Sequence, residues 1–295
     1  MPDIRQITVL GSGTMGLGIA HVAALAGYET RLFDISDDAL QRAARIIHAN
    51  LDKGVARGKV DARDAAAAKE RIALDTDLAQ AVHSADLVIE AVPESLELKI
   101  DIFQRVVSAC PAETVLVSNT SGLSISEMAA ATDRPERFAG MHFFNPVHIM
   151  RLIELVRGDR TSEETLDLLR QVGARMGKEL VTVHESPGFV TSRINALIGN
   201  EAFRMLEAGI ASPEDIDKAL KLGLNHPMGP FEMVDLVGLD IRLSILEFLH
   251  STLGETYRPT QLMRDYVAAG RLGRKTGRGV YRYDDDGRRV EGSDA

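Results

Sequence analysis

The hydrophobic pattern divides the chain into two parts. In the first part, short apolar runs alternate with stretches in which apolar residues recur every three or four positions, the longest from about Asp37 to Arg57. Continuous apolar runs are typical of strands that are covered on both faces of a parallel sheet. The expected strands are Ile7–Leu10, Thr30–Phe33, Leu87–Ala91, Thr114–Ser118, Phe138–Phe143, Leu152–Val156 and Leu180–Val183.

The alternation of strands and helices stops at Ser186-Pro187-Gly188. Serine followed by proline is a common helix start, so we expect a helix with Pro187 in its first position. We predict the α/β class: an N-terminal Rossmann-like, doubly wound domain over residues 1–186, an all-helical C-terminal domain over 187–283, and a disordered polar tail over 284–295. The helices expected in the second domain are Pro187–Ala208, Pro213–Leu222, Pro230–Leu253 and Thr260–Ala269.

The composition predicts a soluble, globular protein, with 26% charged and 45% hydrophobic residues. No apolar run is long enough for a membrane helix, and the first residues lack the hydrophobic block of a signal peptide. The single cysteine, Cys110, excludes an internal disulfide and suits a reducing cytoplasm. The net charge of −9 argues against nucleic acid as a partner, although Lys53, Arg57 and Lys59 form a local basic cluster.

A glycine-rich turn, Gly11-Ser12-Gly13-Thr14-Met15-Gly16, follows the first apolar run and opens a helix. In this context Gly11 permits a tight turn, Gly13 lets the backbone approach a pyrophosphate, and Gly16 lets helix and strand pack closely. The phosphates then meet free N–H groups at the helix N-terminus. Asp34 ends the next expected strand, where a carboxylate binds ribose hydroxyls and repels a 2′-phosphate. The pattern therefore predicts NAD, in preference to NADP, as cofactor.

Three residues that suit proton transfer lie near the ends of successive expected strands: Ser121, His142 and Glu154. A histidine can remove a hydroxyl proton while a carboxylate holds its ring, and a serine hydroxyl can stabilise charge on the oxygen. Beside a dinucleotide, this set predicts coupled proton and hydride transfer. His148 follows His142 closely, but no HExxH motif or acidic cluster accompanies it, so we expect no metal.

Long motifs occur throughout the chain: GSGTMG, IEAVPE, SNTSGLSI, MHFFNPVHIMRLIELV, SPGFV, EDIDKALKLGLNHPMGPFEMVDLVGLD and LGRKTGRGVY. Together they resemble the (S)-3-hydroxyacyl-CoA dehydrogenase family, and within it the short-chain 3-hydroxybutyryl-CoA dehydrogenases. The resemblance covers nearly the whole chain. It implies NAD-dependent oxidation of an (S)-3-hydroxyacyl-CoA, with 3-hydroxybutyryl-CoA as the expected substrate, to the 3-ketoacyl-CoA, together with the reverse reaction. It also implies a homodimer that forms through the helical domain.

Position by position, the resemblance implies that His142 is the general acid/base, that Glu154 is its electrostatic partner, and that Ser121 hydrogen-bonds the 3-oxygen of the substrate. It also implies contacts away from the reaction centre. Those with the cofactor fall to Gly11, Gly13, Thr14, Met15, Gly16, Asp34, Glu94, Lys99, Asn119, Asn145 and Lys275, and those with the substrate's coenzyme A moiety to Asn50, Lys53 and Arg57.

One position departs from the family pattern. Family members commonly carry an active-site asparagine in Pro-Gly-Phe-(Val/Ile)-Val-Asn-Arg, and this chain has Ser192 in its place. Serine is shorter and offers one hydroxyl instead of a carboxamide. Either Ser192 itself takes the catalytic position, or Asn195 supplies an amide from a neighbouring face of the helix. We rank direct use of Ser192 first.

Other functions fit parts of the pattern. A dehydrogenase of a free hydroxy acid or sugar acid could share the fold, but it needs no distant phosphate site, so the basic cluster discriminates against it. Longer or carboxylated acyl chains, such as 3-hydroxyadipyl-CoA, also fit. A non-catalytic dinucleotide-binding protein would have no use for Ser121, His142 and Glu154 together.

Overall fold

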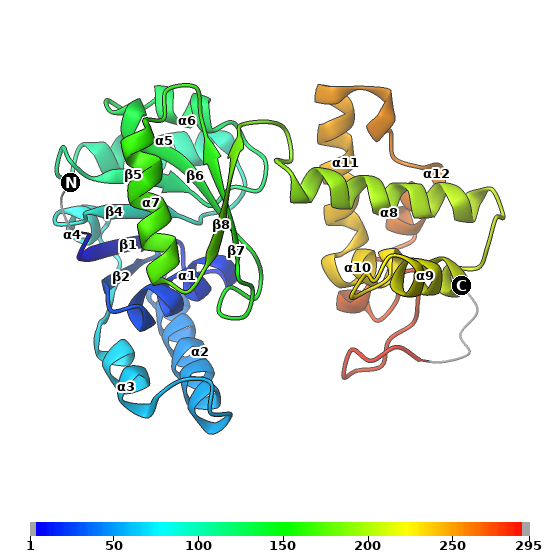
Figure 1. The fold of residues 1–295 in the computed structure, drawn as a ribbon, viewed down its shortest axis with the longest axis horizontal. Coiled ribbons are helices and arrows are strands. Elements are labelled where there is room, and N and C mark those ends of the chain that lie inside the picture. The colour runs from blue at the N-terminus through cyan, green and yellow to red at the C-terminus, as the bar shows by residue number, and fades with distance from the viewer. Residues whose placement is uncertain (1–3, 291–295) are drawn as a thin grey trace. The chain divides into compact units, whose positions relative to one another are not determined.

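A computed structural model describes residues 4–290 of the chain. They form two compact units, which divide between Phe189 and Val190 (Figure 1). The first unit, coloured blue to green, holds the sheet. The second, coloured yellow-green to red, is helical.

The first unit is built on an eight-stranded sheet with the order β3-β2-β1-β4-β5-β6-β7-β8. All neighbouring strands are parallel except β6 and β7, which are antiparallel. The predicted doubly wound α/β domain is therefore confirmed. The strands are β1 (Gln6–Leu10), β2 (Glu29–Phe33), β3 (Ile72–Asp75), β4 (Leu87–Glu90), β5 (Val115–Ser118), β6 (Phe138–Phe143), β7 (Leu152–Arg157) and β8 (Glu179–His184).

Helices cover both faces of this sheet, and each face has its own apolar core. One core joins the sheet to α1, α2, α3 and α7, with buried residues such as Ile19, Leu40 and Leu169. The other joins it to α4, α5 and α6 through residues such as Phe103 and Met128. Burial on both faces is why the central strands read as continuous apolar runs. The helices are α1 (Thr14–Leu25), α2 (Asp37–Ala56), α3 (Ala62–Glu70), α4 (Leu78–Val82), α5 (Leu96–Val107), α6 (Ile125–Ala130) and α7 (Glu163–Arg175).

The apolar pattern predicted neither β3 nor the direction of β7. The edge strand β3 lies beside β2 and is only partly buried, so its residues show no continuous apolar run. The reversal of β7 carries no local signal, because an antiparallel strand buried on both faces has the same apolar pattern as a parallel one.

The second unit consists of α8 (Thr191–Glu207), α9 (Pro213–Gly223), α10 (Pro230–Val237), α11 (Leu239–Leu253) and α12 (Gln261–Ala268). Its core includes Phe203, Phe231 and Leu246. No helix among residues 4–290 is long and apolar enough to cross a membrane.

Two helix boundaries differ from the prediction. The helix expected from Pro187 begins at Thr191, because Ser186–Phe189 form a turn in which the Phe189 N–H donates to the Ser186 carbonyl at 2.9 Å and Gly188 has φ 70°. The helix expected over Pro230–Leu253 is two helices. Gly238 separates them, because its φ of 107° lies outside the helical region of backbone conformation.

A buried carboxylate holds the start of α10. Asp217 accepts hydrogen bonds from the Phe231 N–H (2.8 Å), the Glu232 N–H (3.1 Å) and the Tyr281 hydroxyl (2.8 Å). The bonds from Phe231 and Glu232 satisfy two N–H donors at the first turn of α10 that the helix itself leaves unpaired. Burial raises the pKa of Asp217 to about 6.

The segment after Tyr283 is ordered over residues 284–290. The Asp284 N–H donates to the Arg288 carbonyl, and the Val290 N–H to the Arg282 carbonyl, each at 2.9 Å. The prediction of a disordered tail over 284–295 is therefore wrong for 284–290, and residues 291–295 lie outside the described residues.

Candidate active site

The glycine-rich turn has the shape that a dinucleotide requires. Gly11 has φ 96°, and its N–H donates to the Phe33 carbonyl at 2.8 Å. A Cβ on Gly16 would lie 1.7 Å from the Gly11 carbonyl oxygen, whereas a Cβ on Gly13 would have no atom within 4 Å. Gly13 is also the N-cap of α1, with no side-chain cap. The turn therefore leaves open space and uncapped N–H groups where a pyrophosphate binds.

Asp34 follows β2 and is held in place by the turn itself. Its Oδ2 accepts from the Ser12 N–H at 2.9 Å and the Ser12 hydroxyl at 2.7 Å, and its Oδ1 accepts from the Ser36 N–H at 3.1 Å. Burial opposes ionisation, but these hydrogen bonds outweigh it and lower the pKa of Asp34. A carboxylate that stays charged here favours ribose hydroxyls over a 2′-phosphate.

His142 and Glu154 form a buried pair across β6 and β7. The antiparallel register sets the two residues directly opposite each other, and His142 Nδ1 lies 2.8 Å from Glu154 Oε2. Glu154 is 0% exposed and His142 is 7% exposed. When Nδ1 carries the hydrogen it donates a hydrogen bond to the Glu154 carboxylate, and the neutral ring then presents the lone pair of Nε2 as a base. The rings of Phe144 and Phe189 lie 4.6 and 5.9 Å from the imidazole.

Ser121 lies in the loop after β5 and is positioned by Glu94. One Glu94 oxygen accepts from the Thr120 hydroxyl (2.6 Å), the Ser121 N–H (2.9 Å) and the Ser121 hydroxyl (3.3 Å). Asn119 joins this loop to the end of β6, because its Oδ1 accepts from the Phe143 N–H at 2.9 Å. The loop of Ser121 is thus tied to the strand that carries His142.

Lys99 is buried, and protein atoms use its ammonium group. It lies 2.6 Å from Glu90, 3.2 Å from Glu94 and 3.2 Å from the Val92 carbonyl. A contact between Lys99 and the cofactor requires one of these three interactions to break. Sequence reasoning missed Glu90 altogether. The sequence did contain a signal for this pair: an acid ends an apolar strand, and a lysine follows nine positions later in the next helix.

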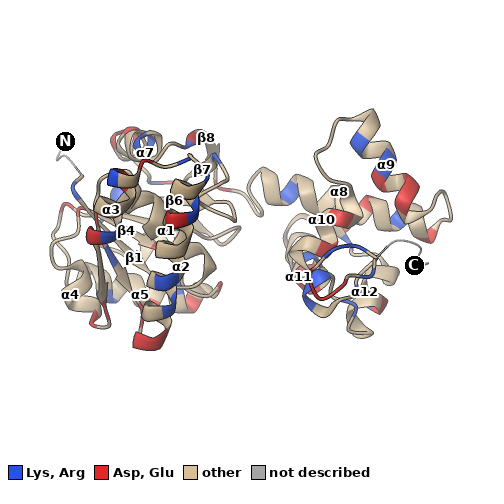
Figure 2. Ribbon diagram, turned by 90° about the horizontal axis from the view of Figure 1, so that it is seen from below, with Lys and Arg blue, Asp and Glu red and all other residues tan. Residues whose placement is uncertain are grey.

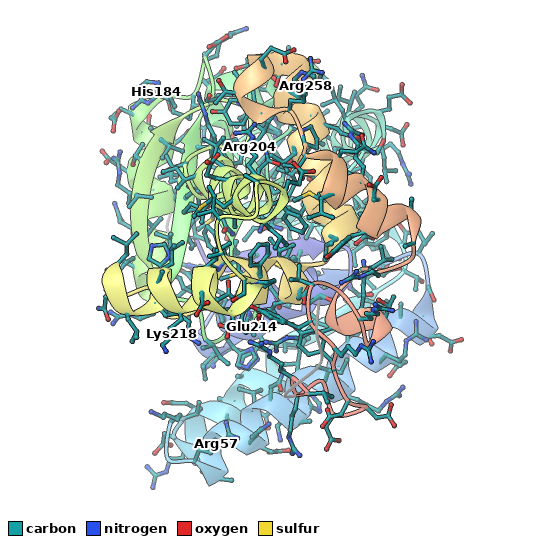
Figure 3. All side chains as sticks on the ribbon, turned by 90° about the vertical axis from the view of Figure 1, so that its right-hand side faces the viewer. Arg57, His184, Arg204, Glu214, Lys218 and Arg258 are labelled. Carbon is teal, nitrogen blue, oxygen red and sulfur yellow. The ribbon has the colours of Figure 1, made fainter. Side chains whose placement is uncertain are left out.

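The basic cluster lies at the end of α2. Lys53 and Arg57 are exposed, and Arg57 is the C-cap residue of the helix (Figure 3). Figure 2 shows Lys and Arg segments along α2 in blue. The pKa of His148 is lowered, first by burial and then by the charges of Lys178 and Lys53. The positive charge of Lys53 is therefore felt at His148, which lies in the loop between β6 and β7.

The remaining predicted residues are spread over both units. In the first unit, Asn50 is half-buried on α2 and Asn145 is exposed. In the second, Lys275 pairs with Asp240 at 2.6 Å, and Ser192 and Asn195 both lie near the start of α8. The roles of these residues stay predictions.

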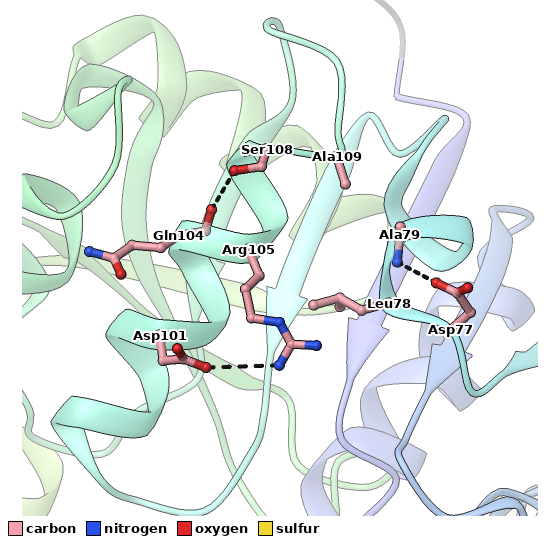
Figure 4. Close-up of a pocket in the computed structure, with 8 residues that line it drawn as sticks. All are labelled: Asp77, Leu78, Ala79, Asp101, Gln104, Arg105, Ser108 and Ala109. Atoms are coloured by element: carbon pink, nitrogen blue, oxygen red, sulfur yellow. Dashed lines mark hydrogen bonds and ion pairs between the residues drawn. The ribbon is translucent and has the colours of Figure 1, made fainter.

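A cavity of about 480 Å³ lies elsewhere in the first unit, beside α4 and α5 (Figure 4). It is lined by residues such as Leu78, Asp101 and Arg105, and Arg105 and Asp101 are 3.8 Å apart. Both of these charged side chains are more than half exposed. None of the predicted site residues lines the cavity, so it is not part of the site.

The mostly parallel sheet and the glycine turn with Asp34 define a dinucleotide-binding protein of the oxidoreductase class, and the buried His142–Glu154 pair has the geometry that proton transfer requires. The chain belongs to the 3-hydroxyacyl-CoA dehydrogenase family: residues 6–186 match its NAD binding domain and residues 188–283 match its C-terminal domain. It is an NAD-dependent 3-hydroxyacyl-CoA dehydrogenase, as the resemblance implied.

Individual relatives agree with this assignment. The 3-hydroxybutyryl-CoA dehydrogenase of Bradyrhizobium diazoefficiens is 43% identical over 95% of this chain and 96% of that protein. The 3-hydroxyadipyl-CoA dehydrogenase of Escherichia coli is 42% identical over 95% of this chain and 59% of that protein. The crystal structure of (S)-3-hydroxybutyryl-CoA dehydrogenase from Ralstonia eutropha is similar with a TM-score of 0.92 and 44% identity, over 96% of this chain and 100% of that one.

Proposed function

We propose that the chain interconverts (S)-3-hydroxybutyryl-CoA and acetoacetyl-CoA with His142 as general acid/base. The observation that carries this proposal is the 2.8 Å contact between His142 Nδ1 and Glu154 in a buried setting. NAD, when bound, accepts the hydride that leaves C3 of the substrate. In that direction His142 Nε2 removes the proton of the 3-hydroxyl, and the Ser121 hydroxyl bonds the same oxygen. In the reverse direction His142 returns the proton to the ketone oxygen.

The proposed role of Glu154 is electrostatic. As His142 takes up the proton it becomes an imidazolium, and the adjacent carboxylate stabilises that charge. The carboxylate also fixes which ring nitrogen carries hydrogen, so that Nε2 is the base.

The test is NADH oxidation with acetoacetyl-CoA. We expect ready turnover by the native protein and loss of turnover in His142→Ala with folding intact, as checked by circular dichroism. Equal turnover in that variant would exclude the mechanism, and tight NAD binding without turnover of any acyl-CoA would indicate a non-catalytic binding protein.

The rate with acetoacetate, which lacks coenzyme A, distinguishes an acyl-CoA substrate from a free acid. Lys53 and Arg57 are exposed cations that suit the phosphates of coenzyme A. Their replacement by alanine should raise KM for acetoacetyl-CoA and leave NADH binding unchanged. Lys69→Ala is the matched control, because Lys69 is already paired with Asp52 at 2.6 Å. Comparable rates with acetoacetate would favour the free-acid alternative, and rates on longer and dicarboxylated 3-ketoacyl-CoA compounds define the acyl preference.

We also infer a homodimer that forms through the helical unit, and a cytoplasmic location. The helical unit exposes large apolar side chains, among them Leu222 (76%), Leu224 (67%) and Ile210 (64%). Exposed apolar surface of this kind marks an interface in many proteins. Light scattering should give twice the chain mass, and a monomer at micromolar concentration would refute the dimer.

The inferred cytoplasmic location rests on the free thiol of Cys110.

A further inference from the structure

Glu90 is a buried acid that the reaction outlined above does not use. It is the last residue of β4 and is 0% exposed. Its Oε1 accepts from Lys99 Nζ at 2.6 Å and from the Val92 N–H at 2.7 Å, and its Oε2 accepts from the Ser118 hydroxyl at 2.5 Å. A carboxylate is costly to bury unless it is paired and hydrogen-bonded, and each oxygen of Glu90 has a partner.

Lys99 links the buried Glu90 to Glu94, which is partly exposed to solvent. Its ammonium lies 2.6 Å from Glu90 and 3.2 Å from Glu94, so one positive charge serves two carboxylates. The Lys99 side chain is 1% exposed and that of Glu94 is 43% exposed. With Glu90 and Glu94 ionised, the three side chains carry a net charge of −1, and Glu94 presents it at the surface.

Glu94 and the loop before it contact two parts of the candidate site: the Ser121 loop and the glycine turn. Glu94 holds the Ser121 N–H and hydroxyl, as described above. The loop that joins Glu90 to Glu94 also touches the glycine turn, because a Cβ on Gly11 would lie 2.7 Å from the Ala91 carbonyl oxygen. In the order β2-β1-β4-β5, the loops after β1 and β4 flank the switch point at which dinucleotides bind.

We propose that Glu90 is a positioning residue that sets the place and the charge of Glu94, and so favours the oxidised over the reduced cofactor. This inference rests on the proposed function. The nicotinamide ring is positively charged in NAD⁺ and neutral in NADH, so a net negative group at this edge stabilises NAD⁺ selectively. Without Glu90, Lys99 neutralises Glu94 and the selective attraction is lost.

The test compares the dissociation constants of both cofactor forms in Glu90→Gln, Glu90→Asp and Glu97→Gln. Glutamine keeps the shape of Glu90 and removes its charge, whereas aspartate keeps the charge on a shorter side chain. Glu97→Gln removes an exposed carboxylate from the first turn of the same helix, α5, and is the matched control. NAD⁺ binding is measured by calorimetry and NADH binding by its own fluorescence, which tryptophan does not disturb because the chain has none.

We expect the ratio Kd(NADH)/Kd(NAD⁺) to fall about fivefold in Glu90→Gln, because the variant removes the net negative charge that would attract the positive nicotinamide of NAD⁺ and not the neutral ring of NADH. The ratio should stay at the native value in Glu90→Asp and Glu97→Gln. Because it is a ratio, a change in the fraction of folded protein does not move it.

Four outcomes would contradict either the role of Glu90 or the proposed function on which it rests. A Glu90→Gln variant that weakens both forms equally has lost structure and not charge selectivity. A ratio that falls equally in Glu97→Gln reflects general surface charge. Native protein that binds neither form refutes the proposed function itself, whereas native binding of both forms with an unchanged ratio in Glu90→Gln refutes only the role of Glu90.

Discussion

Replacement of Glu154 by glutamine should lower kcat roughly 100-fold while the protein stays folded. Two unit charges about 4 Å apart interact by about 4 kcal/mol at an effective dielectric constant of about 20, and the 2.8 Å contact sets His142 and Glu154 near that separation. Glutamine keeps a neutral hydrogen bond worth about 1 kcal/mol. The net loss of about 3 kcal/mol in the stabilisation of the protonated ring corresponds to roughly two orders of magnitude in rate.

The assay is steady-state NADH oxidation with acetoacetyl-CoA in Glu154→Gln, His142→Ala and the double variant. Because Glu154 acts on the reaction through His142, its replacement should have no further effect once His142 is absent. Glu179→Gln is the control: it removes an exposed carboxylate from β8, the other neighbour of β7. Thermal melting followed by circular dichroism establishes that each variant is folded.

Two results would refute this reasoning. A kcat for Glu154→Gln within about threefold of the native value would show that the buried charge does not stabilise the protonated ring. Losses that multiply in the double variant would show that Glu154 acts on the substrate or cofactor independently of His142.

Three further predictions concern the cofactor turn, its specificity and the second unit. Gly13→Ala should weaken NAD binding by a factor of about ten or more and leave the Tm unchanged. Gly16→Ala should weaken NAD binding and also lower the Tm, because only the Cβ at position 16 collides with the backbone. Calorimetry measures the binding, and melting curves measure the Tm. Asp34→Asn should reduce the NAD over NADP preference in kcat/KM about tenfold, because the charge that repels a 2′-phosphate is lost. The folded pKa of Asp217, about 6, exceeds the ordinary value of 3.8 for an aspartate. Its contribution to stability is therefore present below pH 3.8 and lost as pH rises through about 6. Urea unfolding midpoints should depend less on pH across that window in Asp217→Asn.

Local patterns predicted the parts of the fold that local sequence controls. The strands at the centre of the sheet were recognised because both faces are buried, and the glycine turn because its spacing, the preceding strand and Asp34 occur together. The break at Gly238 was missed because the apolar spacing continues through it, and only the positive φ separates α10 from α11. Glu90 was missed for a different reason. A buried acid is recognisable only once its partner is known, and Lys99 meets it through the tertiary packing of α5 on β4 and β5.

The reversal of β7 explains how Glu154 reaches the site at all. Ligands of a parallel sheet lie at the carboxyl ends of its strands, and His142 is near the carboxyl end of β6. A parallel β7 would begin at the opposite edge of the sheet, and Glu154, the third residue of the strand, would then lie two residues, or roughly 7 Å, from the level of His142, which is the fifth residue of β6. Because β7 is antiparallel, its amino end lies at the ligand edge, and the register sets Glu154 beside His142 on the same face. The separation of 12 residues between them is thus closed by one short connection. The one antiparallel pairing among the eight described strands, that of β6 with β7, thus sets a carboxylate against the histidine that we propose as the base.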